Sequence, residues 1–103
     1  MGYSNMKSRA NEKYSWDSKK RELNIKKRGL DFVELADAIF EDPNLVIEPD
    51  NRKDYNEARY WAFALVNNIR FCLCFTPRDD KIHLITIYKM NKRQWRKHYD
   101  NKG

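Results

Sequence analysis

The stretch that decides the fold is RYWAFALVNNIRFCLCFTPRDDKIHLITIY, residues 59–88. It contains three strand-like runs rich in β-branched and aromatic residues, separated by two short polar connections. The runs are residues 59–66, 69–75 and 81–88, and the connections are residues 67–68 and 76–80. Connections this short join neighbouring strands that run in opposite directions. The stretch therefore predicts an antiparallel meander.

The middle run, residues 69–75, is apolar at nearly every position. A strand that is apolar on both sides is usually covered on both sides, so this run is predicted to be central in the sheet. It holds the two cysteines of the chain, Cys72 and Cys74. Their side chains project from the same face of a strand, which is an awkward geometry for a disulfide, and a metal site would need further soft ligands. We expect two reduced, packed thiols.

Upstream of the meander the sequence predicts a short strand and two helices. Tyr14 and Trp16 alternate around a serine, as in a strand, and Asp17 is placed to cap a helix that runs to about Arg28. Gly29 supplies the left-handed stop. The second helix begins at Asp31, ends at Pro43 and precedes a short strand at residues 45–47; its apolar stripe is Phe32, Leu35, Ala36, Ile39 and Phe40.

Downstream of the meander, Asn91 caps a last, basic helix. The order of elements is that of an α+β domain: a short strand and two helices, an antiparallel meander and a C-terminal basic helix. At 103 residues the chain has room for one modest core. We expect a single domain over residues 14–103, preceded by a flexible extension over residues 1–13. No apolar run approaches the length of a membrane span, so a cytoplasmic location is expected.

The net charge of +6 is unevenly distributed along the chain. Residues 1–28 contain nine basic and three acidic side chains, residues 29–58 two and nine, and residues 59–103 ten and three. If the two basic ends meet in the fold, they form a surface for a polyanion. If they stay apart, the asymmetry is no more than the lopsided surface of a small soluble domain.

Several enzyme classes lack their signatures in this sequence. There is no glycine-rich phosphate loop, no HExxH, no paired CxxC and no GxSxG. The acidic residues form no evident convergent set, so we expect no metal and no cofactor. The remaining chemistry suits metal-free RNA cleavage, which needs a base, an acid and cations around the phosphorane. The candidates are Arg59, Arg70, Arg78, Lys89, Arg93, Arg96, Lys97, His83, His98, Tyr88 and Tyr99.

Three of these candidates have a structural interpretation as well as a catalytic one. An unperturbed histidine is suited to proton transfer, but His83 and His98 each also fit a surface or packing role. Tyr88, at the end of its strand, is placed to stack on a base, to donate a proton or to pack on Trp95.

In the last helix, four cations fall within one arc of about 140° at roughly 100° per residue. They are Lys92, Arg93, Arg96 and Lys97.

The segment WDSKKRELNIKKRG, residues 16–29, resembles the opening W-D-x-x-K-x-x-x-N-x-x-K-H-G of the BrnT toxins of bacterial toxin-antitoxin pairs. The likeness continues through Leu30-x-Phe32-x-Glu34, Asp42-Pro43, Glu57-x-Arg59, Thr76-x-Arg78 and the closing strand and basic helix, and so covers about residues 14–99. Two positions depart from the family pattern. Arg28 replaces the histidine before the glycine, and Thr86-Ile-Tyr88 replaces the Ser-x-Arg that usually ends the last strand, with Lys89 as the nearest cation.

The resemblance implies a RelE-like fold and a metal-independent endoribonuclease that arrests translation. It also implies neutralisation by a BrnA-like, ribbon-helix-helix antitoxin, through which alone the complex would bind operator DNA. On this hypothesis Arg59 and Arg78 clamp phosphate, Lys89 and Arg93 add electrostatic stabilisation, and Tyr88 or a histidine transfers a proton. RNA binding is assigned to Lys92, Arg96, Lys97, His98 and Tyr99.

Two alternatives follow from the absent family arginine and from the basic surface. In the first, the chain is a module that binds RNA or the antitoxin without efficient cleavage. In the second, its basic surface serves only an acidic antitoxin. Salt-sensitive RNA binding without product distinguishes the first from a nuclease, and a lack of RNA affinity at low salt distinguishes the second.

Overall fold

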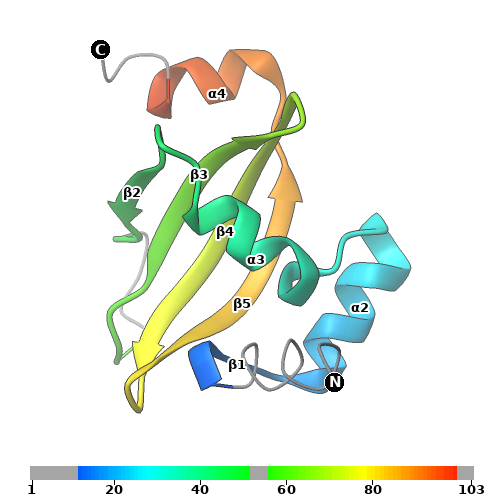
Figure 1. Cartoon of the computed structure of the whole chain (residues 1–103), viewed down its shortest axis with the longest axis vertical. Coiled ribbons are helices and arrows are strands. Elements are labelled where there is room, and N and C mark those ends of the chain that lie inside the picture. Colours follow the sequence, from blue (N-terminus) through cyan, green and yellow to red (C-terminus); the bar gives the residue numbers. More distant parts are fainter. Residues whose placement is uncertain (1–11, 52–55, 100–103) are drawn as a thin grey trace, which may run out of the picture.

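The computed structural model describes residues 12–51 and 56–99, and its α+β architecture confirms the predicted fold class (Figure 1). Except for Glu12 and Lys13, the predicted N-terminal extension lies outside the described residues. The elements are β1 (Tyr14–Trp16), α2 (Ser18–Arg28), α3 (Phe32–Phe40), β2 (Val46–Pro49), β3 (Tyr60–Val66), β4 (Ile69–Arg78), β5 (Lys81–Lys89) and α4 (Lys92–His98).

One sheet organises the domain, with its strands in the order β1-β5-β4-β3-β2. β3, β4 and β5 form the antiparallel meander, and β4 is its central strand, as predicted. β2 pairs antiparallel with β3, whereas β1 pairs parallel with β5 over only three residues. Most of β5 beyond Leu84 is therefore not paired with β1, and helix α2 lies along that side of the sheet (Figure 1).

Both hairpins of the meander are closed by two residues in the left-handed conformation. The φ angles are 50° and 65° at Asn67 and Asn68, and 52° and 63° at Asp79 and Asp80. Asparagine and aspartate tolerate this conformation, which is the type I′ geometry that matches the twist of the strands. The second connection is shorter than predicted, because Thr76–Arg78 extends β4.

The helix caps explain where the first two helices begin and end. The Asp17 carboxylate accepts from the backbone N–H of Lys19 at 2.8 Å, and Asp31 accepts from that of Val33 at 3.0 Å. Gly29 has φ 68° and donates its N–H to Ile25, so α2 stops there as predicted. α3 ends at Phe40, before the predicted stop at Pro43.

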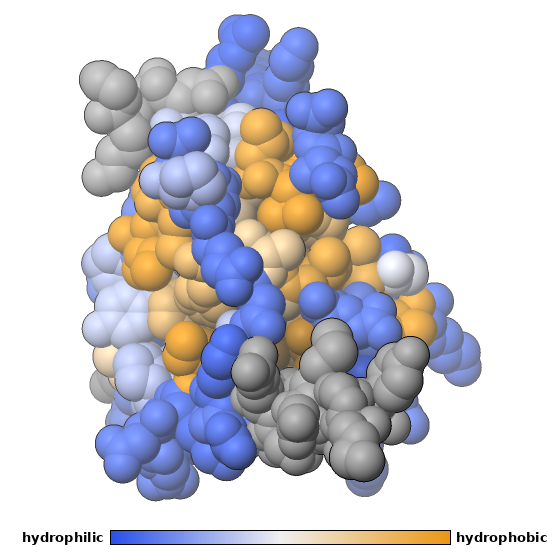
Figure 2. Space-filling view, viewed as in Figure 1, coloured by the Kyte–Doolittle hydropathy of each residue, from blue (hydrophilic) through white to orange (hydrophobic). Residues whose placement is uncertain are grey.

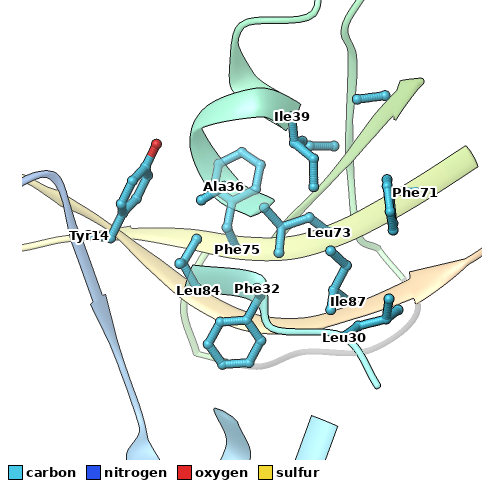
Figure 3. Packing of buried hydrophobic residues seen from close by; sticks show 12 residues of the cluster. Tyr14, Leu30, Phe32, Ala36, Ile39, Phe71, Leu73, Phe75, Leu84 and Ile87 are labelled. Carbon is cyan, nitrogen blue, oxygen red and sulfur yellow. The ribbon is translucent and has the colours of Figure 1, made fainter. Parts of the chain in front are cut away.

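The main core lies between α3 and one side of the sheet, called here the α3 face (Figure 3). Phe32, Ala36 and Ile39 of α3 pack on Leu73 and Leu84 of the strands, and all five are fully buried. Each large apolar side chain in this layer contributes about 1.5–3 kcal/mol by leaving water. Figure 2 shows hydrophobic surface gathered in the middle of this side of the molecule, with hydrophilic residues around it.

A smaller core lies on the opposite side of the sheet, called here the α4 face. Val46, Phe63 and Cys72 pack under Trp95 of α4. Both cysteines are free and buried, as predicted, and burial raises the pKa of the Cys72 thiol to about 11. In the described part of the chain no helix is both long and apolar enough to span a membrane.

Candidate functional site

Alternation along the strands places most of the predicted site residues on the α4 face. Three rows of residues cross it from β3 through β4 to β5. The first row is Phe63, Cys72 and Tyr88, the second is Trp61, Cys74 and Thr86, and the third contains Thr76 and His83. Trp95 of α4 covers part of the first row. Tyr88, at the end of that row, and Trp61, in the second row, are only half-buried.

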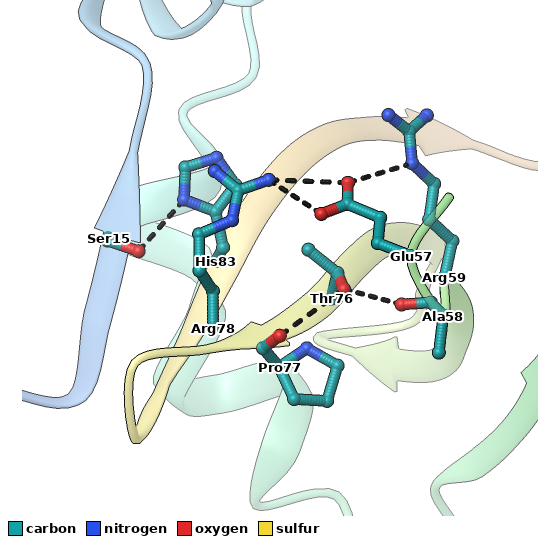
Figure 4. Close-up of polar contacts among 8 residues, drawn as sticks. All are labelled: Ser15, Glu57, Ala58, Arg59, Thr76, Pro77, Arg78 and His83. Atoms are coloured by element: carbon teal, nitrogen blue, oxygen red, sulfur yellow. Dashed lines mark hydrogen bonds and ion pairs between the residues drawn. The ribbon is translucent and has the colours of Figure 1, made fainter. Parts of the chain in front are cut away.

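Arg59 and Arg78 converge on one carboxylate beside the third row (Figure 4). Arg78 Nη2 donates to Glu57 at 2.9 Å (Oε1) and 3.2 Å (Oε2), and Arg59 Nε lies 3.5 Å from Glu57 Oε2. The hydrogen bond from Arg78 is the main cause of the lowered pKa of Glu57, which is therefore ionised at neutral pH. These three residues are called the arginine–glutamate cluster. Two guanidinium groups and one carboxylate leave it with a net positive charge.

The cluster is held against β4 by a buried hydroxyl. Thr76, which is 1% exposed, donates from Oγ1 to the carbonyl of Ala58, between Glu57 and Arg59 (Figure 4). The backbone N–H of Asp50 donates to the Arg59 carbonyl at 2.8 Å. The segment that carries Glu57 and Arg59 is thus fixed to β4 and to the end of β2.

His83 lies beside this cluster, opposite Thr76 in the strand register. Its Nδ1 is 2.8 Å from Oγ of Ser15 on β1 (Figure 4). Burial lowers the pKa of His83, and the positive charges of Arg78 and Lys20 lower it further, while Glu57 opposes them. The imidazole is therefore mostly neutral at neutral pH and able to accept a proton.

A groove of about 250 Å³ separates α2 from β5 and is called here the α2–β5 groove. It is lined by Lys20, Leu23, Asn24, Lys27, Arg28, Ile85, Thr86 and Tyr88. Arg28 stacks on Tyr88, with its Cζ atom 4.3 Å from the ring centroid. The Tyr88 ring also lies 5.8 Å from the Trp61 ring, so the predicted packing of Tyr88 involves Trp61 and Arg28 as well as the core under Trp95.

The basic helix α4 presents Lys92, Arg93, Arg96 and Lys97 to solvent. His98 and Tyr99, in contrast, fasten the helix to the sheet. His98 stacks on Phe63 with ring centroids 4.3 Å apart and contacts Glu48 at 2.9 Å. Tyr99 donates from its hydroxyl to Asp42 Oδ2 at 3.1 Å and stacks on Trp95.

Lys89 is not brought together with the other candidates. It lines a second groove, with Ile69 and Phe71, on the α3 side of the sheet. Arg70, from the same strand as Phe71, donates from Nε to the carbonyl of Met90 and so supports the entry into α4.

The four polar residues by which α2 lines the α2–β5 groove received no role from the sequence. Lys20, Asn24 and Lys27 appeared only as matches to a family motif, and Arg28 only as a departure from it. Their spacing of four, three and one residues places all four on one side of a helix, which is a signal that the sequence did carry. The sequence does not show that this side of α2 faces β5.

Within residues 12–51 and 56–99, no group of three or more His, Cys, Asp or Glu side chains is placed to hold a metal ion. Comparisons with curated proteins and with solved structures found no match. The family model described as "Ribonuclease toxin, BrnT, of type II toxin-antitoxin system" matches residues 16–94. This segment covers most of the chain, including the arginine–glutamate cluster and the α2–β5 groove. The chain therefore belongs to the BrnT family of ribonuclease toxins of type II toxin-antitoxin systems.

Proposed function

We propose that this toxin is a metal-independent endoribonuclease that arrests translation, with its cleavage centre at Arg59, Arg78 and His83. The observation that carries the proposal is the convergence of the two arginines on Glu57, beside a histidine that is neutral at neutral pH. Cations that are already held in place stabilise the charge of a phosphorane without having to reorganise during the reaction.

The proposed reaction is an attack of the RNA 2′-hydroxyl on the adjacent phosphorus. His83 accepts the hydroxyl proton while the bond from the 2′-oxygen to phosphorus forms. Arg59 and Arg78 bind the non-bridging oxygens as charge builds on them. The bond from phosphorus to the 5′-oxygen then breaks, and the leaving oxygen takes a proton from water. The products are a 2′,3′-cyclic phosphate and a 5′-hydroxyl.

Tyr88, the other candidate for proton transfer, lies five residues beyond His83 on β5. At a strand rise of about 3.3 Å per residue, their Cα atoms are roughly 16 Å apart. His83 is held at Ser15, whereas Tyr88 contacts Trp61 and Arg28, so the two side chains do not serve one phosphate. We therefore assign proton transfer to His83 and not to Tyr88.

The remaining assignments stay predictions. The exposed cations of α4, Lys92, Arg96 and Lys97, suit contacts with the RNA backbone. Lys89 and Arg93 were predicted as electrostatic stabilisers, but no described contact links either of them to the arginine–glutamate cluster. His98 and Tyr99 are engaged with the sheet, so their contribution to RNA binding would come through the position of α4.

Incubation of the purified protein with RNA in EDTA tests the nuclease proposal. Wild-type protein is expected to cleave and to leave 2′,3′-cyclic ends. Arg59→Ala plus Arg78→Ala should abolish cleavage. A matched control, Lys19→Ala plus Lys26→Ala, removes two exposed charges from α2 and should cleave normally. A folded wild-type protein that binds RNA without cleaving it, or full cleavage by the double arginine variant, contradicts the proposal.

A type II toxin is paired with an antitoxin, and we propose a BrnA-like, ribbon-helix-helix partner that carries any operator DNA binding. A cytoplasmic location follows from the proposed RNA substrate. Co-expression of the toxin with a short neighbouring reading frame of ribbon-helix-helix pattern tests the pairing. The two chains should co-purify and growth arrest should be relieved, whereas a frame that neither binds the toxin nor protects the cells argues against this partner.

A further inference from the structure

The α2–β5 groove has the charge of an anion site. Three of its eight lining residues are cations, Lys20, Lys27 and Arg28, and none is acidic. Another cation of the same helix is neutralised within the fold. Arg21 on α2 makes a two-point ion pair with Asp31, at 3.0 and 2.7 Å.

Among the described residues, the three cations of the groove make no ion pair with a carboxylate. Their charges remain available to a ligand. The concentration of like charges on one wall is unfavourable by itself, and a bound anion would offset the repulsion.

The floor of the groove is rigid. Asn24 is 3% exposed, donates from Nδ2 to the Ile87 carbonyl at 2.9 Å and accepts from the Thr86 hydroxyl at 3.0 Å. Its amide therefore fixes the distance between α2 and β5. The cations beside it, each about one turn away along the helix, are held at the rim of a preformed space.

Arg28 is the best placed of the three cations. The Cζ atom of its guanidinium lies over the Tyr88 ring, 4.3 Å from the ring centroid. A stacked guanidinium keeps its N–H donors in the plane of the group, where they can bind two oxygens of one phosphate. Tyr88 in turn is supported by Trp61, so the stack of three side chains orients Arg28 in advance.

The two departures from the BrnT motif are neighbours in this stack. The motif places an arginine at the position of Tyr88, and this chain instead carries an arginine at position 28, on the opposite wall.

We propose that the α2–β5 groove binds a backbone phosphate of the RNA, with Arg28 as its principal ligand and Tyr88 as the residue that positions Arg28. This inference rests on the proposed ribonuclease function and extends it to a second subsite. Tyr88 and His83 lie on the same strand, roughly 16 Å apart at about 3.3 Å per residue, so the phosphate belongs to a different nucleotide from the one cleaved. Lys20 lines the groove, and its charge also contributes to the lowered pKa of His83.

The test measures binding of a fully 2′-O-methylated RNA, which cannot be cleaved, by fluorescence anisotropy at several salt concentrations. Arg28→Ala should weaken binding about tenfold or more and reduce the salt slope by about 0.7, the loss of one phosphate contact. Lys26→Ala, an exposed charge two residues away on α2 but outside the groove, is the matched control and should leave both unchanged. Tyr88→Phe retains the ring and should bind as the wild type does, while Tyr88→Ala should weaken binding.

A second variant keeps the proposal falsifiable if Arg28→Ala loses structure. Arg28→His plus Tyr88→Arg returns the guanidinium to β5 and should bind more tightly than Arg28→His alone. Equal affinities of folded Arg28→Ala and Lys26→Ala proteins overturn the proposal. The binding measurement does not depend on cleavage. A wild-type protein that binds RNA through Arg28 but does not cleave it supports the phosphate subsite and refutes the nuclease proposal. A wild-type protein that cleaves RNA, with Arg28→Ala binding as tightly, supports the nuclease proposal and refutes the subsite.

Discussion

Arg78, the last residue of β4, donates from Nη2 to Glu57, which precedes β3, at 2.9 Å. The same carboxylate lies 3.5 Å from Nε of Arg59, so one acidic residue holds both arginines of the proposed cleavage centre. A phosphate that enters the cluster must compete with the carboxylate for the guanidinium groups. Glu57 therefore has two opposed effects, because it orients the arginines and weakens their attraction for RNA.

Glu57→Gln should separate these effects. The loss of negative charge is expected to tighten binding of non-cleavable RNA several-fold, because Glu57 no longer competes with the ligand for the two guanidinium groups. Cleavage in a single turnover should slow by about tenfold or more, because the arginines lose the ion pairs that orient them. Stability should change by less than about 1 kcal/mol, since the Arg78 and Glu57 side chains are 43% and 29% exposed.

Glu41→Gln, a change at an exposed acidic residue at the end of α3, is the control for the general effect of charge on RNA binding. Weaker RNA binding by Glu57→Gln than by this control would contradict the arrangement described here. Unchanged cleavage would show that the arginines need no carboxylate to orient them.

The pH dependence should report His83, whose pKa lies below its ordinary value of 6.5 because of burial and the nearby Arg78. As a base it must be neutral, so kcat/KM should fall on the acid side with an apparent pKa below 6.5. His83→Gln should lose about 10²–10⁴-fold in kcat/KM together with this acidic limb. Rates measured between about pH 5 and 8 test this role of His83. An acidic limb that persists in His83→Gln excludes His83 as the base.

The same lowered pKa has a consequence for stability. The unfolded chain binds a proton at His83 near the ordinary pKa of 6.5, whereas the folded chain binds it only at lower pH. Stability should therefore decrease as the pH falls from 6.5 towards the folded pKa, and be regained as the pH rises. Urea unfolding across this range should show a smaller pH dependence in His83→Gln. An unchanged dependence would assign the effect to other groups.

Asn24→Ala should destabilise the fold and disorder the groove together. The substitution leaves the buried carbonyl of Ile87 without its amide donor and Thr86 without its acceptor, at a cost of about 1–3 kcal/mol. Thr86→Val removes only the hydroxyl and should cost less. Urea unfolding measures both, and a cost for Asn24→Ala no larger than that of Thr86→Val would show that Asn24 does not anchor α2 to β5.

The sequence predicted the elements well because their signals are local. Capping aspartates at positions 17 and 31, Gly29 and the paired asparagines and aspartates of the two turns each determine the conformation of their own segment. The apolar pattern of the meander likewise identified β4 as the central strand. The second turn was predicted too long, since proline at position 77 suggested a loop where it is tolerated in the strand.

The site was less predictable, because it depends on register and on which side of α2 faces the sheet. The convergence of Arg59 and Arg78 on Glu57 requires the β3–β4 register, which the sequence leaves open. The stack of Arg28 on Tyr88 joins two elements from opposite ends of the chain. That His83 lies on the same side of the sheet as Thr86 and Tyr88 follows from strand alternation only after the bulge near Phe75 is known.

The exposed cations of α4 and His98 are expected to have different roles. Lys92, Arg96 and Lys97 are exposed, whereas His98 stacks on Phe63 and contacts Glu48 at 2.9 Å. The triple alanine variant of the three cations should lower the salt slope of RNA binding by up to about 2, at about 0.7 per phosphate contact, and leave stability nearly unchanged. His98→Ala should instead destabilise the protein by about 1 kcal/mol through the lost ring contact.

Anisotropy with non-cleavable RNA and urea unfolding of the same samples separate the two roles. His98→Phe is the matched variant, since it keeps a ring to stack on Phe63 and removes the contact with Glu48. If His98 acts through the position of α4, His98→Phe should retain more stability and more RNA affinity than His98→Ala. If RNA affinity falls equally in both variants while their stabilities differ, His98 contacts the RNA directly and does not act through the position of α4.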